Sequence, residues 1–255
     1  MTVMEFFGCA FLAFGPPLAM FTFTIAKDPI RIIILIASAF FWLLSLLISS
    51  LWWFIVVPLK SKLAFGLVFS VFFQEIFRFL IYKLLQKAEV GLKKVTDADT
   101  QITNSKHVLA YVSGMGFGVM SGAFSLVNVL ADAVGPATMG LKGGSDLFFI
   151  TSAAFTLCMI LLHTFWGVIF FSAADNRNYL QIVWVVGSHL AVSCLTLMNS
   201  QMWYAATLIP SYIILLINGS IAFSVVGGSL RSLGASMYLK ERRHISENGQ
   251  SLTVD

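Results

Sequence analysis

Seven stretches of this chain are apolar over a length that suits a membrane-crossing helix, for which about 20 residues are needed. They are Phe6–Ala26, Ile30–Val57, Leu63–Leu85, Val108–Val134, Leu147–Phe171, Leu180–Asn199 and Ala206–Leu230. Of the 255 residues, 58% are hydrophobic and 11% are charged, whereas soluble domains carry about 25% charged residues. The sequence therefore predicts an all-α membrane protein, a seven-transmembrane helix bundle that occupies residues 1–232.

Polar residues concentrate in a loop at about residues 86–107 and in a tail, residues 233–255, that we expect to be disordered. One side of the bundle collects Lys27, Arg31, Lys83, Lys87, Lys93, Lys94, Lys106, Arg177, Arg231, Lys240, Arg242 and Arg243, and the other only Lys60, Lys62 and Lys142. Because cytosolic loops are enriched in lysine and arginine, we predict a lumenal or extracellular N-terminus and a cytosolic C-terminus. These basic residues lie in short loops and the tail rather than on one face, so no nucleic-acid partner is predicted.

The first apolar stretch contains the sequence Gly15, Pro16 and Pro17. Proline removes a helical hydrogen bond and bends the helix that contains it. We expect this stretch to cross the membrane as a bent helix. An unwound segment at the prolines would be tolerated where neighbouring helices bury it.

A glycine repeat marks the fourth apolar stretch, in which residues 111–136 read YVSGMGFGVMSGAFSLVNVLADAVGP. Gly114, Gly118 and Gly122 recur every four residues, although glycine weakens a helix in water by roughly 1 kcal/mol relative to alanine. In lipid, small residues let two helix backbones approach closely. The same face, an arc of about 120°, also carries Ser121, Ser125, Asn128 and Asp132. We predict a helix-packing face, which could receive a helix of this chain or of a partner.

Polar and ionisable side chains also occur near the middle of four other apolar stretches. Glu75 and Arg78 lie one helical turn apart, with Gln74 beside them, and the later stretches contribute His163, His189 and Asn218. Ionisable residues inside a membrane are costly, so they normally face a bundle interior and find partners there. The sequence therefore predicts one shared polar interior, with Glu75 and Arg78 as an ion pair and the two histidines hydrogen-bonded nearby.

Several catalytic signatures are missing from this interior. The chain has no H-E-x-x-H zinc motif and no G-x-S-x-G nucleophile turn. An aspartyl mechanism needs two facing carboxylates within the membrane, but Asp132 sits at a helix end and Asp146 in a loop, and neither has an intramembrane partner. We therefore predict no catalytic residue, no metal and no cofactor.

Two other classes of function stay open on these residues. A seven-span receptor would share the predicted topology, but the third stretch ends in Phe79–Tyr82 without an Asp-Arg-Tyr-like triplet. A small transporter or an intramembrane enzyme could use Glu75, Arg78, His163 and His189.

Ordered sequence blocks add a resemblance to a known family. They are FFGCAFLAFGPPLA, DPIRIIILIASAFFWLLSLLISS, QEIFRFLIYKLL, AYVSGMGFGVMSGAFSLVNVLADAVGP, ILLHTFWGVIFF, GSHL and GGSLRS. Together they resemble the anterior-pharynx-defective (Aph-type) subunit of γ-secretase. The resemblance extends over all seven apolar stretches to about Ser232 and leaves out the long polar loop and the tail.

The resemblance implies a non-catalytic scaffold that first binds nicastrin and then joins presenilin and the presenilin-enhancer subunit. Presenilin supplies both catalytic aspartates of that complex, which cleaves type I membrane proteins such as Notch and the amyloid precursor. A multi-pass protein of the endoplasmic reticulum, Golgi, plasma membrane and endosomes, surrounded by lipids, is implied as well. The family's glycine repeat maps onto Gly114, Gly118 and Gly122 and implies a role in assembly. Its two intramembrane histidines map onto His163 and His189 and imply a role in presenilin association.

Overall fold

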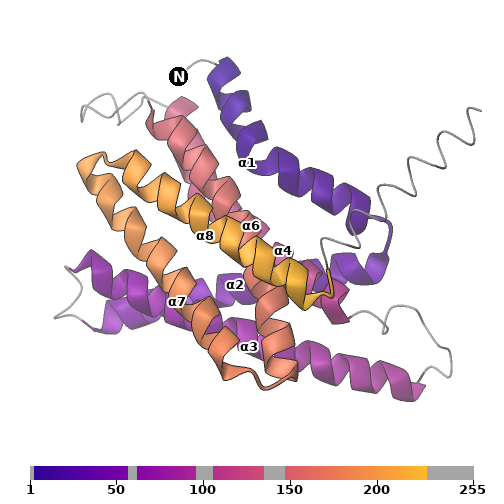
Figure 1. Ribbon diagram of the computed structural model, residues 1–255. Helices are drawn as coiled ribbons and strands as arrows, with labels where there is room; N and C mark the ends of the chain where they lie inside the picture. The colour runs from indigo at the N-terminus through magenta and orange to yellow at the C-terminus, as the bar shows by residue number, and fades with distance from the viewer. Residues whose placement is uncertain (1–2, 57–61, 96–105, 135–146, 229–255) are drawn as a thin grey trace, which may run out of the picture.

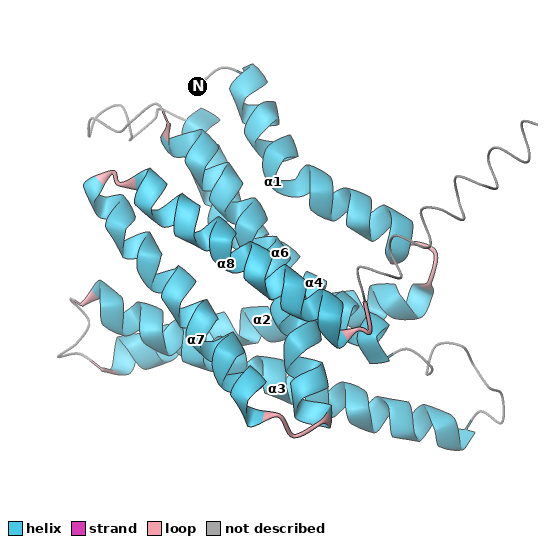
Figure 2. Cartoon of the chain, in the orientation of Figure 1, coloured by secondary structure: helices cyan, strands magenta, loops and turns pink. Residues whose placement is uncertain are grey.

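The structure is a computed structural model of the chain, and it describes residues 3–56, 62–95, 106–134 and 147–228 (Figure 1). The elements are α1 (Val3–Thr24), α2 (Pro29–Ile55), α3 (Leu63–Val95), α4 (Lys106–Val134), α6 (Phe148–Asp175), α7 (Tyr179–Leu195), the 3₁₀-helix η2 (Thr196–Gln201) and α8 (Tyr204–Val225). Seven of the described helices are long and apolar enough to cross a membrane. The predicted seven-transmembrane helix bundle is therefore confirmed, and Figure 2 shows helices joined by short loops throughout the described ranges.

Helix α6 is the centre of the bundle. It packs most extensively against α4, and it also contacts α1, α7 and α8, while α2 lies against α3 and α4. The largest cluster of buried apolar side chains surrounds α6 and includes Trp42, Phe117, Leu162 and Trp166. A helix with neighbours on several sides can carry polar groups along its length, because those groups face protein rather than lipid.

Local sequence explains where several helices begin and turn. Asp28 caps α2 by accepting a hydrogen bond from the backbone N–H of Ile30 at 3.0 Å, and Pro29 occupies the first turn, where no N–H is needed. Asn178 caps α7 by accepting from the N–H of Gln181. Arg177, which precedes this cap, adopts a φ of 54° in the turn between α6 and α7.

Helix α1 stays helical from Val3 to Thr24 with Pro16 and Pro17 inside it, and Figure 1 shows that it changes direction midway. The predicted bend is therefore confirmed, and the unwound segment allowed at the prolines is absent from this described helix. The φ angle of proline suits a helix, so losing the two proline N–H groups bends α1 without opening it.

Two predicted boundaries differ from the structure. Helix α3 continues to Val95, so the first half of the loop predicted at residues 86–107 is helical. Its sequence there, QKAEVGLKKV, is rich in strong helix formers, and hydropathy detects where a helix leaves lipid rather than where it ends. Near Asn199 the predicted sixth span changes to the 3₁₀-helix η2. The remaining loop, residues 96–105, and the tail, residues 233–255, lie outside the described residues.

Candidate functional site

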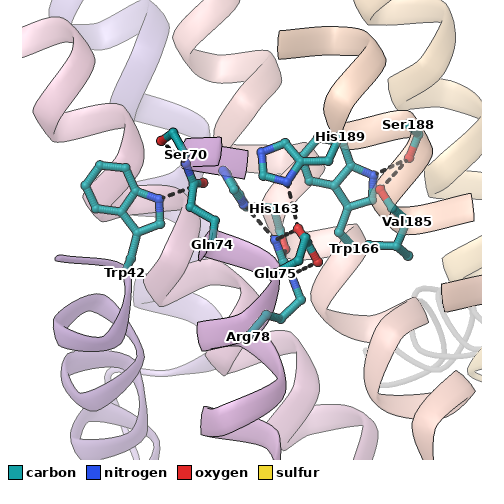
Figure 3. A network of polar contacts seen from close by, with 10 residues as sticks. All are labelled: Trp42, Ser70, Gln74, Glu75, Arg78, His163, Trp166, Val185, Ser188 and His189. Carbon is teal, nitrogen blue, oxygen red and sulfur yellow. Dashed lines mark hydrogen bonds and ion pairs between the residues drawn. The ribbon is translucent and has the colours of Figure 1, made fainter. Parts of the chain in front are cut away.

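The candidate site is a buried polar network between α3, α6 and α7, and Figure 3 shows its side chains from close by. Glu75 and Arg78 share one face of α3 because residues three apart are neighbours on a helix. The Nε atom of Arg78 donates to Oε2 of Glu75 at 3.0 Å, and Nη2 donates to Oε1 at 3.2 Å. Such paired contacts fix the guanidinium against the carboxylate in one orientation.

Both intramembrane histidines join this ion pair. Arg78 donates through Nη1 to the backbone oxygen of His163 at 3.3 Å, and its Nη2 lies 3.0 Å from Nδ1 of the same residue. Nδ1 of His189 lies 2.7 Å from Oε1 of Glu75. The structure thus brings together four of the residues that the sequence assigns to the polar interior, two from α3 and one each from the consecutive helices α6 and α7.

The hydrogen-bond partners define the role of each imidazole nitrogen. Arginine can only donate, so Nδ1 of His163 accepts and the proton of that ring lies on Nε2. A carboxylate only accepts, so Nδ1 of His189 donates to Glu75. Nε2 of His163 has no hydrogen-bond partner among the described atoms. Both contacts to the ion pair therefore use Nδ1, once as an acceptor and once as a donor.

Aromatic side chains enclose the network. The ring of Trp166 lies 4.4 Å from that of His189 and 5.3 Å from that of His163, measured between centroids. Its indole N–H donates to Oγ of Ser188 at 2.9 Å, which fixes the orientation of the ring. The guanidinium of Arg78 lies over the ring of Phe117, 5.1 Å from its centroid. Sequence reasoning missed these three residues, although Trp166 follows His163 by three positions and Ser188 adjoins His189.

The network is closed to solvent and to lipid. His163 is 0% exposed, Arg78 and His189 are 1% exposed, and Glu75 is 6% exposed. None of the three described cavities is lined by any of these four side chains. The polar interior that the sequence predicts is therefore filled by its own side chains in the described part of the chain.

Two residues assigned to the same interior lie apart from the network. Gln74 faces α2, where its Oε1 accepts from Nε1 of Trp42 at 3.1 Å. Asn218 of α8 accepts from Nε1 of Trp184 at 3.2 Å and donates to the backbone oxygen of Ile214 at 2.9 Å. Both amides satisfy tryptophan N–H groups across neighbouring helices, one between α2 and α3 and the other between α7 and α8.

The glycine face of α4 receives α6 of the same chain. A Cβ placed on Gly114 would lie 2.7 Å from the backbone oxygen of Thr164, and one on Gly118 would lie 2.5 Å from that of Ile160. From the other side, a Cβ on Gly167 would lie 2.7 Å from Cα of Gly114. Of the two occupants that the sequence left open, the structure places the chain's own helix here.

The glycine face becomes looser towards its far end. A Cβ on Gly122 would meet the Ile160 side chain at 2.6 Å rather than any backbone atom. Ser121 is half-buried, and Ser125 is exposed and donates to the backbone oxygen of Gly122. The side chains of Asn128 and Asp132 lie outside the described residues. Close backbone contact is therefore concentrated at Gly114 and Gly118.

A further glycine, Gly116, makes a contact that the four-residue repeat did not identify. A Cβ at this position would collide with the backbone oxygen of Leu35 in α2. Nearby, Ser38 of α2 donates to Ser113 of α4 at 2.9 Å. Helix α4 is thus packed tightly on two faces, against α6 and against α2, and the odd spacing in Gly114-Met115-Gly116 is the signal in the sequence.

These features define a class of protein, a polytopic α-helical membrane protein whose intramembrane charges join its own helices. Comparison with known proteins then identifies the family. The model of the family described as Aph-1 protein matches residues 4–229. The chain belongs to the Aph-1 family, as its sequence blocks indicate.

Relatives at high identity cover nearly the whole chain. The γ-secretase subunit Aph-1 of Drosophila melanogaster is 62% identical over 232 residues, which are 91% of this chain and 97% of that protein. Aph-1b of Danio rerio is 51% identical and covers 97% of this chain and 98% of its own length. APH-1B of Homo sapiens is 47% identical and covers 98% of this chain and all of its own length. All three relatives carry the name of a γ-secretase subunit.

Proposed function

We propose that this chain is a non-catalytic subunit of a γ-secretase complex and serves as a scaffold for its assembly. The observation that carries the proposal is the similarity to relatives named γ-secretase subunits, which extends over at least nine-tenths of the chain in each of the three cases above. The closed polar network supports it, because the four buried side chains join helices of the chain to one another. The receptor and the transporter or enzyme alternatives have no comparable support.

The partners that we propose are presenilin, nicastrin and the presenilin-enhancer subunit, with presenilin supplying the catalytic aspartates. The substrates of the assembled complex would be type I membrane proteins such as Notch and the amyloid precursor. We propose the endoplasmic reticulum as the place of assembly and the Golgi, plasma membrane and endosomes as later locations. The resemblance of the sequence blocks to the family is the basis for these assignments.

In this proposal the polar network acts on partners indirectly. His163 and His189 are buried within the chain, so neither imidazole is open to a partner's side chain. Arg78 and Glu75 join α3 to α6 and α7 through them. Removing one imidazole would weaken the connection of α3 to a neighbouring helix, although Arg78 still donates to the backbone oxygen at position 163, and would shift the surface that presenilin contacts. Association with presenilin would then weaken although no contact residue has changed.

Purification of the complex tests this role. The chain carries an affinity tag, and presenilin recovered with it is measured for wild type, His163→Ala, His189→Ala and the double variant. Each single change is expected to lower recovery several-fold, since one interhelical hydrogen bond in a membrane is worth roughly 0.6–2 kcal/mol, and the double change is expected to lower it further. Gly187→Ala serves as the control, because a Cβ there meets nothing within 4 Å.

Activity per recovered complex separates a scaffold from a catalyst. Under the scaffold proposal, complexes that do assemble with His163→Ala cleave substrate at a rate close to that of wild type. Normal recovery combined with a collapse of activity per complex would contradict the proposal and assign the histidines to catalysis. Wild-type recovery and wild-type activity in all the histidine variants would show that the network is not needed for assembly or for cleavage.

A further inference from the structure

A second polar region lies at the ends of three helices, away from the histidine network. There a cavity of about 360 Å³ opens between α3, α4 and α6. Lys106, the first residue of α4, and Asp175, the last residue of α6, stand at its rim, while Ala110 and Phe171 form part of its apolar wall. Both rim residues mark the ends of apolar spans. The cavity therefore lies at a boundary between lipid and water.

Three side chains form a fixed frame on one side of this cavity. The hydroxyl of Tyr82 donates to Oδ1 of Asp175 at 2.7 Å, and Nζ of Lys106 donates to Oδ2 at 3.2 Å. The frame links α3, α4 and α6 through one carboxylate, each oxygen of which accepts one of these bonds and keeps a further acceptor site. The ammonium of Lys106 uses one of its three N–H groups on Asp175, and its side chain is 59% exposed. It can therefore hold an anionic group at the mouth of the cavity.

The charges that line the cavity do not favour a purely anionic ligand. Lys106 is accompanied by two carboxylates, those of Glu89 and Asp175, and by the imidazole of His107. A ligand with a phosphate and a nearby ammonium matches both signs, since the phosphate can approach Lys106 and the ammonium can approach the carboxylates. The apolar wall at Leu85, Ala110 and Phe171 suits the part of such a ligand that continues towards an acyl chain. A volume within the usual range of about 300–1,000 Å³ for small-molecule sites suits a headgroup.

We propose that this cavity binds the headgroup of a zwitterionic phospholipid of the phosphatidylethanolamine type. The phosphate diester accepts hydrogen bonds from Lys106, and the primary ammonium lies towards Glu89 and Asp175. Phosphatidylserine is disfavoured because its additional carboxylate would face the same two acidic residues. The site goes beyond the proposed assembly function and does not depend on it.

A photoactivatable phosphatidylethanolamine with its reactive group near the headgroup tests the site. The purified full-length chain is reconstituted in nanodiscs, illuminated, and digested for peptide mapping. We expect labelling at the adjoining ends of α3, α4 and α6. Lys106→Met should lower this labelling about tenfold, the effect of losing one charge-assisted hydrogen bond, and Lys106→Arg should retain it. Lys87→Met is the matched control, since Lys87 is exposed on α3 and lies outside the cavity lining.

Competition identifies the ligand. Unlabelled phosphatidylethanolamine should displace the probe, and phosphatidylserine should displace it less well. Displacement by inorganic phosphate, or equal competition by phosphatidylserine, would overturn the lipid assignment in favour of an anion site. Labelling that is equal in wild type and Lys106→Met, with both proteins retaining wild-type helix content, would overturn the site itself. Loss of labelling when the partner subunits are present would assign the cavity to a protein segment instead.

Discussion

Replacing Gly118 by alanine should destabilise the bundle far more than one added methyl group suggests. The new Cβ would lie 2.5 Å from the backbone oxygen of Ile160 and 3.0 Å from its Cα. Ordinary contact at such positions begins at 3.4 Å, so the carbonyl is about 0.9 Å too close. A backbone carbonyl in the middle of α6 cannot rotate away, because it is held within that helix. The two helices must therefore move apart along their contact.

The expected cost follows from this displacement. Overpacking a well-packed interior costs typically about 1–3 kcal/mol, and separated helices also lose dispersion contacts that nothing in lipid replaces. We expect Gly118→Ala to fall at the upper end of this range and Gly114→Ala to be similar, since its Cβ would meet two backbone oxygens. Gly122→Ala should cost less than about 1 kcal/mol, because the Ile160 side chain it meets can change rotamer.

Thermal unfolding of the purified chain in detergent, together with recovery of the complex, measures this order. Gly187→Ala is the control, since a Cβ there meets nothing within 4 Å and alanine favours the helix by roughly 1 kcal/mol. All variants should still insert. Equal stability of Gly118→Ala and Gly187→Ala, or a larger loss of stability for Gly122→Ala than for the other variants, would refute the predicted backbone collision.

Four further outcomes are expected. Gly122→Leu should insert normally but lower the yield of complex on native gels, because a leucine side chain is too large to be accommodated by a rotamer change of Ile160. A normal yield of complex would contradict this expectation. His189→Asn should preserve presenilin recovery better than His189→Gln, since the amide of asparagine occupies the place of Nδ1, the atom that contacts Glu75; equal recovery would refute the assigned nitrogen. Arg78→Lys should lower the unfolding temperature, because an ammonium cannot reproduce the guanidinium contacts to Glu75 and His163. An unchanged unfolding temperature would show that these contacts do not stabilise the bundle. Glycosylation acceptors at the two termini should be modified only before Met1, and a glycan after Asp255 would invert the predicted topology.

The seven helices could be predicted from the sequence because lipid imposes a length and a composition on each span. The same rule explains the error at α3, where the apolar run stops near Leu85 but the helix continues to Val95. Outside the bilayer, helix formation depends on propensity and neighbouring structure rather than on hydropathy. The bend of α1 was predictable from Pro16 and Pro17, whereas the persistence of its helix was not.

The candidate site could be predicted only as a set of residues. Intramembrane charge and helical spacing identify Glu75, Arg78, His163 and His189, because each is costly unless it finds a partner. Spacing along one helix does not determine which helix lies opposite. For that reason the sequence places Gln74 in the same interior as Glu75, although the rotation of about 100° per residue turns Gln74 towards Trp42 of α2.

A polar network inside a scaffold is best understood through what apolar contacts in lipid cannot do. Leucine and phenylalanine side chains pack almost equally well against a neighbouring helix or an acyl chain, so they specify the position of a helix weakly. The ion pair of Glu75 and Arg78 is satisfied only when α3 lies at the height where His163 and His189 complete its contacts. Displacement of α3 by one turn would keep this ion pair, since both residues belong to α3, but it would break the hydrogen bonds to His163 and His189, each worth roughly 0.6–2 kcal/mol in a membrane. The close glycine contact in turn fixes the distance between α4 and α6. The network and the glycine contact together therefore determine the relative positions of helices that hydrophobic burial alone would leave undetermined.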